Sequence, residues 1–369
     1  MGTPTTTEAS ATAVPAAQSD FPKLKRPYAN YIRAIAAFAV VLIHSSGELL
    51  NTLDNSIAFD AAWWTGNVYY SFLRWATPFF IMLSGSILLK SRDGDSIAGF
   101  LRQRAVRVLL PFAFWVFVYI LYEYRGGFPM LPELLNKVLF TDIYYHLWFI
   151  PMITGLYLLT PIFRTWLKSA ERNEVEYFVG LAFVITGLQH FWPSLIVVKY
   201  IGWLGYIGYY VLGYYLVTYP IRYKKLLYGL GWVSILVNML ATAWVSIKAG
   251  VYVNTFFVYF SPNVVLLSAA WFVYLKEADW GAFSMRYPRL HRCVMRLSEL
   301  SFGLYFIHVL VIDLLKNNYL GFQISPYAFF GMPVSPWMGC MLLALSVTTI
   351  SYLLVELLLL IPFLRKLVM

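Results

Sequence analysis

Long runs of apolar residues, separated by short polar segments, dominate the pattern along this chain. A helix that crosses a bilayer needs about 17–25 predominantly apolar residues. Ten runs approach or exceed that length, and they predict helices at residues 28–50, 67–89, 106–124, 144–163, 175–193, 200–219, 226–247, 251–275, 299–317 and 336–361. The pattern therefore predicts an all-α polytopic membrane protein, a bundle of about ten transmembrane helices.

Two segments outside these runs have patterns of their own. Residues 1–22 are rich in Ser, Thr, Ala and Pro and contain no apolar stretch of signal-peptide type, which predicts a disordered cytoplasmic tail. Residues 131–140 (LPELLNKVLF) predict a short amphipathic helix on the outer membrane surface. We interpret residues 23–369 as one transmembrane domain.

Composition excludes a soluble protein of ordinary surface polarity, because 60% of the residues are hydrophobic and only 12% are charged. The net charge of +10 does not indicate a nucleic-acid partner, since the cations lie in the gaps between apolar runs. Of the 28 Lys and Arg, 21 fall in gaps on the side of the N-terminus, five in the alternate gaps and two within spans. This asymmetry predicts that both termini are cytoplasmic. The two cysteines form no disulfide or zinc pattern, and no metal site is expected.

Arg33 and His44 are the most informative polar residues, because both lie within the first apolar run. Their spacing of eleven residues places them near one helical face, about 16 Å apart along the axis. Ionisable residues inside a membrane helix are costly and usually functional. We expect Arg33 to bind a substrate near the cytoplasmic surface and His44 to transfer protons deeper in the membrane; the alternative for His44 is a packing role.

Glu48 follows His44 by four residues, so a continuous helix would place both side chains on one face. A carboxylate there can hold the imidazole tautomer and stabilise its charged form, as a catalytic partner does. The alternative is that Glu48 is a charge at the outer surface.

Arg104 and Arg107 share a face just before the third apolar run, one turn after Arg102. Guanidinium groups bind phosphate through paired hydrogen bonds. With Arg33 they can form a site for a nucleotide-type anion at the cytoplasmic mouth. Simple anchoring by positive charge is the alternative.

Two further segments contain candidate residues of less specific pattern. Ser84 and Gly85 indicate close helix packing, with substrate contact by Ser84 as the alternative. His146 and Trp148 are typical either of sugar binding or of an aromatic belt at the membrane surface.

In the ninth run, Ser301, Tyr305 and His308 form one polar stripe at helical spacing. A polar stripe on a membrane helix indicates a face turned toward the interior of the bundle. Tyr305 and His308 are therefore candidates for catalysis, and hydrogen bonds between helices are the alternative.

Taken in order, these motifs resemble the acyltransferase-3 family of integral membrane acyltransferases over residues 28–365. The matching stretches are Arg33-Ala-Ile-Ala-Ala…Val-Leu-Ile-His44, Pro78-Phe-Phe-Ile-Met-Leu-Ser-Gly85, Arg104-x-x-Arg107 with Pro111, His146-Leu-Trp148 and Ser301-Phe-Gly-Leu-Tyr-Phe-Ile-His308. In length the chain is similar to the members that acetylate enterobacterial common antigen and exopolysaccharides. The resemblance implies that Arg33 and His44 are essential, that Arg104 and Arg107 are functional, and that Trp148 and His308 contribute.

The resemblance further implies an O-acyltransferase of the bacterial cytoplasmic (inner) membrane. The expected donor substrate is cytoplasmic acyl-CoA, usually acetyl-CoA, with no bound cofactor. The expected acceptor is a hydroxyl of a cell-surface or secreted polysaccharide, or of its lipid-linked precursor, and the machinery of glycan synthesis is an expected partner. In this hypothesis arginines hold the phosphates of coenzyme A, and His44 either deprotonates the acceptor or carries the acyl group; Tyr305, His308 or Trp148 stabilises the oxyanion. A glycan transporter or flippase is the alternative, and an assembly subunit is a third.

Overall fold

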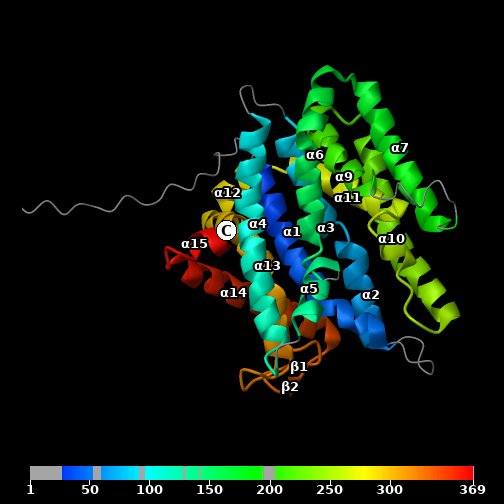
Figure 1. Ribbon diagram of the computed structural model, residues 1–369. Helices are drawn as coiled ribbons and strands as arrows, with labels where there is room; N and C mark the ends of the chain where they lie inside the picture. The colour runs from blue at the N-terminus through cyan, green and yellow to red at the C-terminus, as the bar shows by residue number, and fades with distance from the viewer. Residues whose placement is uncertain are drawn as a thin grey trace, which may run out of the picture.

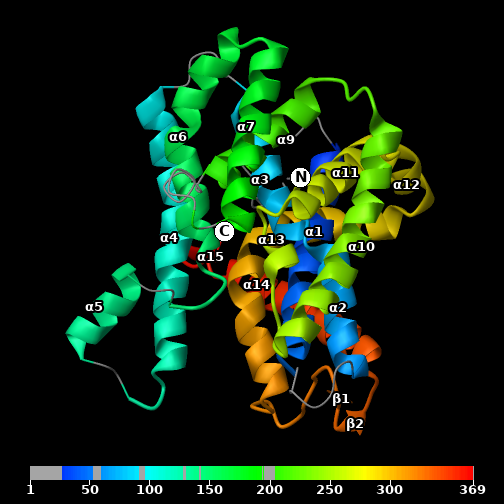
Figure 2. The ribbon, with the colours of Figure 1, turned by 90° about the vertical axis from the view of Figure 1, so that its right-hand side faces the viewer.

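The computed structural model describes residues 27–52, 60–90, 96–127, 130–140, 143–192, 194 and 204–368. The predicted tail of residues 1–22 lies outside the described residues. Within them the chain forms a helical bundle with one small hairpin at one end and the connection between α6 and α7 at the other (Figures 1 and 2). The predicted all-α class is confirmed.

Helix α1 (Pro27–Ser46) runs through the interior of the bundle. Its face of small buried residues, which includes Ala29, Ala36 and Ala39, lets neighbouring backbones come close. It packs against α3, α11, α13 and α14. The α-helix ends in a Ser-Ser-Gly sequence, where the hydroxyl of Ser46 bonds back to the Leu42 carbonyl at 2.9 Å. A 3₁₀ turn, η1 (Gly47–Thr52), follows.

The second predicted span is two helices, α2 (Ala61–Leu73) and α3 (Ala76–Leu88). Pro78 explains the break, because it has no N–H to bond the Arg74 carbonyl four residues earlier. Helical bonding resumes with Phe79 N–H donating to the Trp75 carbonyl at 3.1 Å. Arg74 and Trp75, which lie between the two helices, both keep right-handed helical backbone angles, so the break is local.

Helix α4 (Ile97–Glu123) begins nine residues before the predicted span, after Ser96 caps it by accepting from Gly99 N–H at 3.0 Å. The predicted helix at residues 131–140 is confirmed as α5 (Leu131–Phe140), which lies to one side of the bundle beside α4 (Figure 2); its place on the outer membrane surface stays a prediction. At the C-terminus a short helix, α15 (Arg365–Val368), packs against α4.

The remaining described elements complete the bundle. They are α6 (Phe149–Ser169), α7 (Arg172–Phe191), α9 (Leu204–Thr218), α10 (Lys224–Ala249), η2 (Thr255–Phe257), α11 (Pro262–Glu277), α12 (Trp280–Arg286), α13 (Pro288–Lys316), β1 (Ala328–Phe329), β2 (Met332–Pro333) and α14 (Pro336–Leu359). The two strands pair antiparallel around Phe330 and Gly331, whose φ angles of 51° and 78° suit a tight hairpin turn.

Each of the ten predicted apolar runs contains a helix in the structure. Seven segments of the described chain are long and apolar enough to cross a bilayer: 27–51, 61–88, 97–123, 224–249, 255–277, 288–316 and 336–359. The helices of the other three runs, α6, α7 and α9, are not among the segments that are both long and apolar enough to cross a bilayer. Large apolar side chains such as Phe117, Leu158 and Leu357, each 58–59% exposed, face outward, as expected for contact with lipid. The chain is a multi-pass membrane protein.

Gly85 sets how closely α3 approaches α9. A Cβ atom at Gly85 would lie 1.8 Å from the Tyr210 carbonyl oxygen, and one at Gly213 would lie 2.0 Å from that of Met82. The atoms in the way belong to the backbone, which cannot shift to make room for a Cβ as a flexible side chain can. The predicted packing role of the Ser84-Gly85 step therefore belongs to Gly85, while substrate contact by Ser84 stays a prediction.

We expect Gly85→Ala to destabilise the protein by about 1–3 kcal/mol or more, since the added methyl group overpacks a backbone contact. Gly180→Ala in α7 is the matched control, because nothing lies within 4 Å of a Cβ placed there. Thermal unfolding of the detergent-solubilised variants measures both effects. Equal melting temperatures for the two variants would contradict the close approach.

Candidate active site

Three histidine rings from distant parts of the chain meet inside the bundle. His44 lies near the end of α1, His146 in the turn before α6, and His308 in α13. The His308 ring centroid is 5.3 Å from that of His44 and 5.4 Å from that of His146. We call these three residues the histidine cluster. His146 and His308 are 3% and 0% exposed, whereas His44 is partly exposed, so His44 is the most accessible of the three.

The tautomer of His308 follows from its hydrogen bonds. Its Nδ1 lies 2.7 Å from the Tyr305 carbonyl and 3.1 Å from that of Leu304. A carbonyl oxygen only accepts, so we assign the proton to Nδ1. The Nε2 atom then carries a lone pair, and it is buried without a partner among the described residues. An unpaired buried acceptor is costly, which is typical of a group positioned for function.

His146 belongs to the histidine cluster rather than to an exposed aromatic belt. Both of its ring nitrogens are buried without a hydrogen-bond partner in the described chain. The Tyr305 hydroxyl donates to the His146 backbone carbonyl at 2.7 Å and so ties this turn to α13. No group of three or more His, Cys, Asp or Glu in the described residues has the geometry of a metal site.

The predicted pairing of Glu48 with His44 is wrong in its geometry. It assumed one continuous α-helix, but the α-helix ends at Ser46 and Glu48 lies in η1. The Glu48 carboxylate instead accepts from the Lys316 ammonium, on the last turn of α13. His308 occupies the place beside His44 that the sequence analysis gave to Glu48. We do not retain the catalytic role for Glu48.

Arginines and tyrosines gather near the other end of α1. Arg33 and Arg104 both interact electrostatically with Tyr157 of α6, and Arg104 also with Arg107 and Arg164. The Arg104 guanidinium carbon lies 5.9 Å from the centre of the Tyr157 ring. We call Arg33, Arg104, Arg107 and Arg164 the arginine cluster. The Nε of Arg104 is buried without a hydrogen-bond partner among the described residues, as expected of a group that binds an anion.

Arg164 is a member of this cluster that the sequence analysis counted only as a cation of a cytoplasmic gap. Helix α6 continues to Ser169, so Arg164 lies more than a turn inside it. Its Nε donates to the Leu88 carbonyl at 2.6 Å, and its guanidinium lies 4.5 Å from the Phe100 ring centre. Tyr157 and Arg164 are seven residues apart, so the sequence alone could have predicted that they lie on one face of this helix.

Helix α1 connects the two clusters. Because residues 27–46 form one uninterrupted α-helix, Arg33 and His44 are separated by about 16 Å along its axis. The structure thus brings together the sequence-predicted residues in two groups: Arg33, Arg104 and Arg107 in one, and His44, His146 and His308 in the other.

Trp148 lies in neither cluster. Its ring centroid is 5.8 Å from that of Tyr206 and 6.0 Å from that of Tyr259, so it belongs to an aromatic group on α9 and the segment before α11. His146 and Trp148, which the sequence analysis considered as a pair, therefore face different surroundings.

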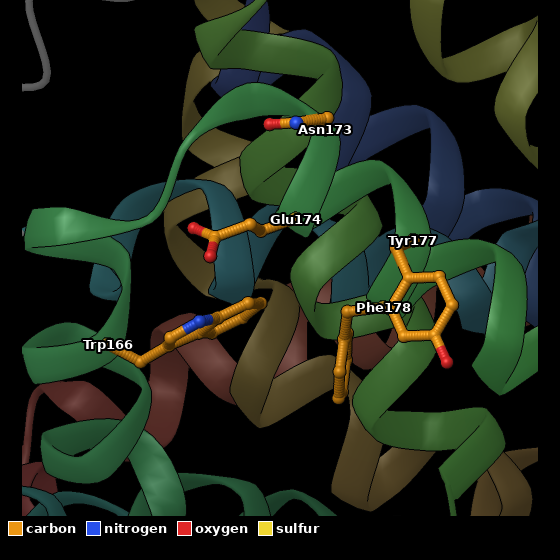
Figure 3. A pocket seen from close by; sticks show the side chains of 5 residues that line it. All are labelled: Trp166, Asn173, Glu174, Tyr177 and Phe178. Atoms are coloured by element: carbon orange, nitrogen blue, oxygen red, sulfur yellow. The ribbon is translucent and has the colours of Figure 1, made fainter.

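A pocket between α6 and α7 contains no residue of either cluster (Figure 3). The Trp166 and Phe178 rings lie 5.3 Å apart beside it, with the Glu174 carboxylate nearby (Figure 3). That carboxylate accepts from the Glu171 backbone N–H at 2.7 Å as part of a helix capping box. Its hydrogen bond serves the start of α7, and we assign no site to this pocket.

Comparison with known proteins identifies the class. The sequence model of a family described as an acyltransferase domain matches residues 26–356, most of the chain. The chain belongs to the acyltransferase-3 family. No curated protein and no solved structure matches it.

This acyltransferase carries the two kinds of group that its class of reaction uses. Imidazoles with a free lone pair can take a proton from an attacking hydroxyl. Converging guanidinium groups can hold the phosphates of an activated donor. Membership in a transferase family favours the enzyme over the transporter that the sequence analysis kept as the alternative.

Proposed function

We propose that the protein transfers an acyl group, in the first place acetyl, from cytoplasmic acyl-CoA to a hydroxyl of a polysaccharide. The acceptor is a cell-surface or secreted glycan or its lipid-linked precursor, and the enzyme resides in the bacterial inner membrane with both termini in the cytoplasm. The observation that supports this is the placement of the arginine cluster and the histidine cluster at two levels of one helix. A donor with a charged head and a long thioester arm fits that separation.

The donor's phosphates bind to the arginine cluster, where Arg33 and Arg104 approach Tyr157 from two helices. Guanidinium forks recognise phosphate oxygens in pairs, and partial burial strengthens each charge-assisted hydrogen bond. The pantetheine arm then extends along α1 and brings the thioester to His44. Coenzyme A and the acyl group act as substrates in this proposal, and we expect no resident cofactor.

Transfer begins when His44 takes the proton of the acceptor hydroxyl. The hydroxyl oxygen attacks the thioester carbonyl, the C–S bond breaks, and the leaving thiolate takes the proton from the imidazolium. His308 acts as a positioning residue, because its buried Nε2 has no partner among the described residues and its ring centroid lies 5.3 Å from that of His44. In a second route His44 itself carries the acyl group between thiol and hydroxyl.

The test uses purified protein in sealed vesicles that contain a bacterial cell-surface glycan, with acetyl-CoA labelled in the acetyl group added outside. Acceptor-dependent release of free coenzyme A with label on the glycan supports the proposal. Glycan movement across the membrane without consumption of acetyl-CoA would support the transporter instead. Replacing acetyl-CoA by succinyl-CoA in a parallel sample tests which acyl group is used.

We expect Arg164→Gln to raise the KM for acetyl-CoA about 10-fold with kcat nearly unchanged, since one charge-assisted contact to phosphate contributes about 1.5–3 kcal/mol. Lys168→Gln is the matched control, because Lys168 is exposed one turn further along α6. Initial rates at varied acetyl-CoA measure both. An unchanged KM in Arg164→Gln would remove Arg164 from the donor site.

A further inference from the structure

Arg74 lies between α2 and α3, outside the arginine cluster, and within electrostatic range of His44. Arg74 caps the end of α2, and its Nε donates to the backbone carbonyl of Phe257, from η2. Arg74 also interacts electrostatically with His44. The mechanism above assigns it no role, although a cation within a membrane-spanning segment is costly and calls for an explanation.

Aromatic rings surround this guanidinium. Its carbon lies 4.3 Å from the centre of the Tyr259 ring and 5.5 Å from that of Tyr70. The Trp148 ring lies 6.0 Å from Tyr259 and 5.8 Å from Tyr206. We call these five residues the Arg74 cage. All five side chains are partly exposed, so their faces are not completely covered by the protein.

The charge of Arg74 is only partly compensated. Neither terminal nitrogen has a hydrogen-bond partner, and Arg74 forms no ion pair, within the described residues. Aromatic faces and one carbonyl offset part of the cost of placing a cation here. An anion that binds in two-pronged fashion would satisfy the terminal nitrogens.

We propose that the Arg74 cage binds the acceptor as a saccharide that carries an anionic group. The inference rests on the proposed function and deepens it. Aromatic side chains stack on the apolar faces of sugar rings, which Trp148, Tyr206 and Tyr259 present together. The guanidinium holds a carboxylate or phosphate of the same saccharide, and a hydroxyl of that saccharide is offered to His44, with which Arg74 interacts electrostatically.

The experiment compares wild type with Arg74→Met in nanodiscs, using p-nitrophenyl β-D-glucuronide, glucose 1-phosphate and the neutral p-nitrophenyl β-D-glucoside as acceptor probes. We expect the variant to raise the KM for the charged probes about 10-fold, as for loss of one charge-assisted contact, and to leave the KM for the neutral probe and for acetyl-CoA unchanged. The two charged probes separate a carboxylate source from a phosphate source. Saturation-transfer NMR measures binding of the same probes without turnover.

Arg222→Met is the matched control, because Arg222 is exposed and contacts the ring of Tyr223. Trp148→Leu is a second variant in case Arg74→Met fails to fold, and it is expected to weaken binding of all three sugars.

The proposal is overturned if wild type binds none of the probes, or if neither variant changes binding. A fall in kcat with every probe at unchanged KM also overturns it, since Arg74 would then act on the reacting carbonyl. Probe binding that persists without transfer of acetyl would instead contradict the proposed function alone.

Discussion

Replacing His44 by alanine is expected to lower kcat for acyl transfer by about 10²–10⁴-fold, the contribution typical of a positioned acid–base group. His44 is the only member of the histidine cluster that is both partly exposed and on the same helix as Arg33. Affinity for coenzyme A should be unchanged, because the arginine cluster is intact. Coenzyme A release measures kcat, and equilibrium dialysis with labelled coenzyme A measures binding.

His190→Ala is the matched control, since His190 lies in α7 with its ring 5.0 Å from that of Phe191 and outside the histidine cluster. Full activity of His44→Ala in a correctly inserted protein would remove the mechanism. Rapid quenching with labelled acetyl-CoA separates the two chemical routes. Label attached to the wild-type protein and absent from His44→Ala indicates an acyl-histidine, whereas no protein-bound label indicates direct transfer.

Arg104→Met is expected to raise the KM for acetyl-CoA by about 10–100-fold, because a hydrogen bond to a charged group contributes about 1.5–3 kcal/mol. Met keeps an unbranched apolar stem like that of Arg and removes the charged guanidinium. Within the described chain the buried Nε of Arg104 has no hydrogen-bond partner, so Arg104 is the member of the arginine cluster that an anion would stabilise most. Initial rates at varied acetyl-CoA give KM, and kcat should change little.

Arg102→Met provides the comparison on the same helix, since the Arg102 side chain is exposed. A general effect of positive charge would shift the KM equally in both variants and would contradict a specific site. The KM of the wild type should also rise with ionic strength, and this salt dependence should be weaker in Arg104→Met than in Arg102→Met.

Much of the architecture could be predicted because the bilayer imposes it. Each apolar run had to form a helix, and polar residues at helical spacing had to face inward, so Arg33 and His44 were identified correctly as interior residues of one helix. The errors arose where local bonding departs from a regular helix. Serine hydroxyls and Gly47 end α1 before Glu48, and Pro78 breaks the second span at Arg74.

Helix periodicity also says little about which helices are neighbours. Nothing local indicated that His146 would join His44 and His308, or that Arg164 would join Arg104. These contacts between residues of different helices depend on how the helices cross. At Gly85, for example, the backbones of α3 and α9 are in close contact. Surfaces that face lipid and surfaces that face another helix have the same apolar composition, so a single sequence does not distinguish them.

The sequence by itself determined that this is an all-helical membrane protein with an arginine and a histidine on one interior stripe. The physical reason is that hydrocarbon admits only segments whose backbone is bonded internally and whose few charges are turned inward. Only the tertiary structure decided which further polar groups share a site: His146 and His308 beside His44, Arg164 beside Arg104, and the cage around Arg74. Those contacts join residues far apart in the chain, and packing between helices, not spacing within one, sets their distances.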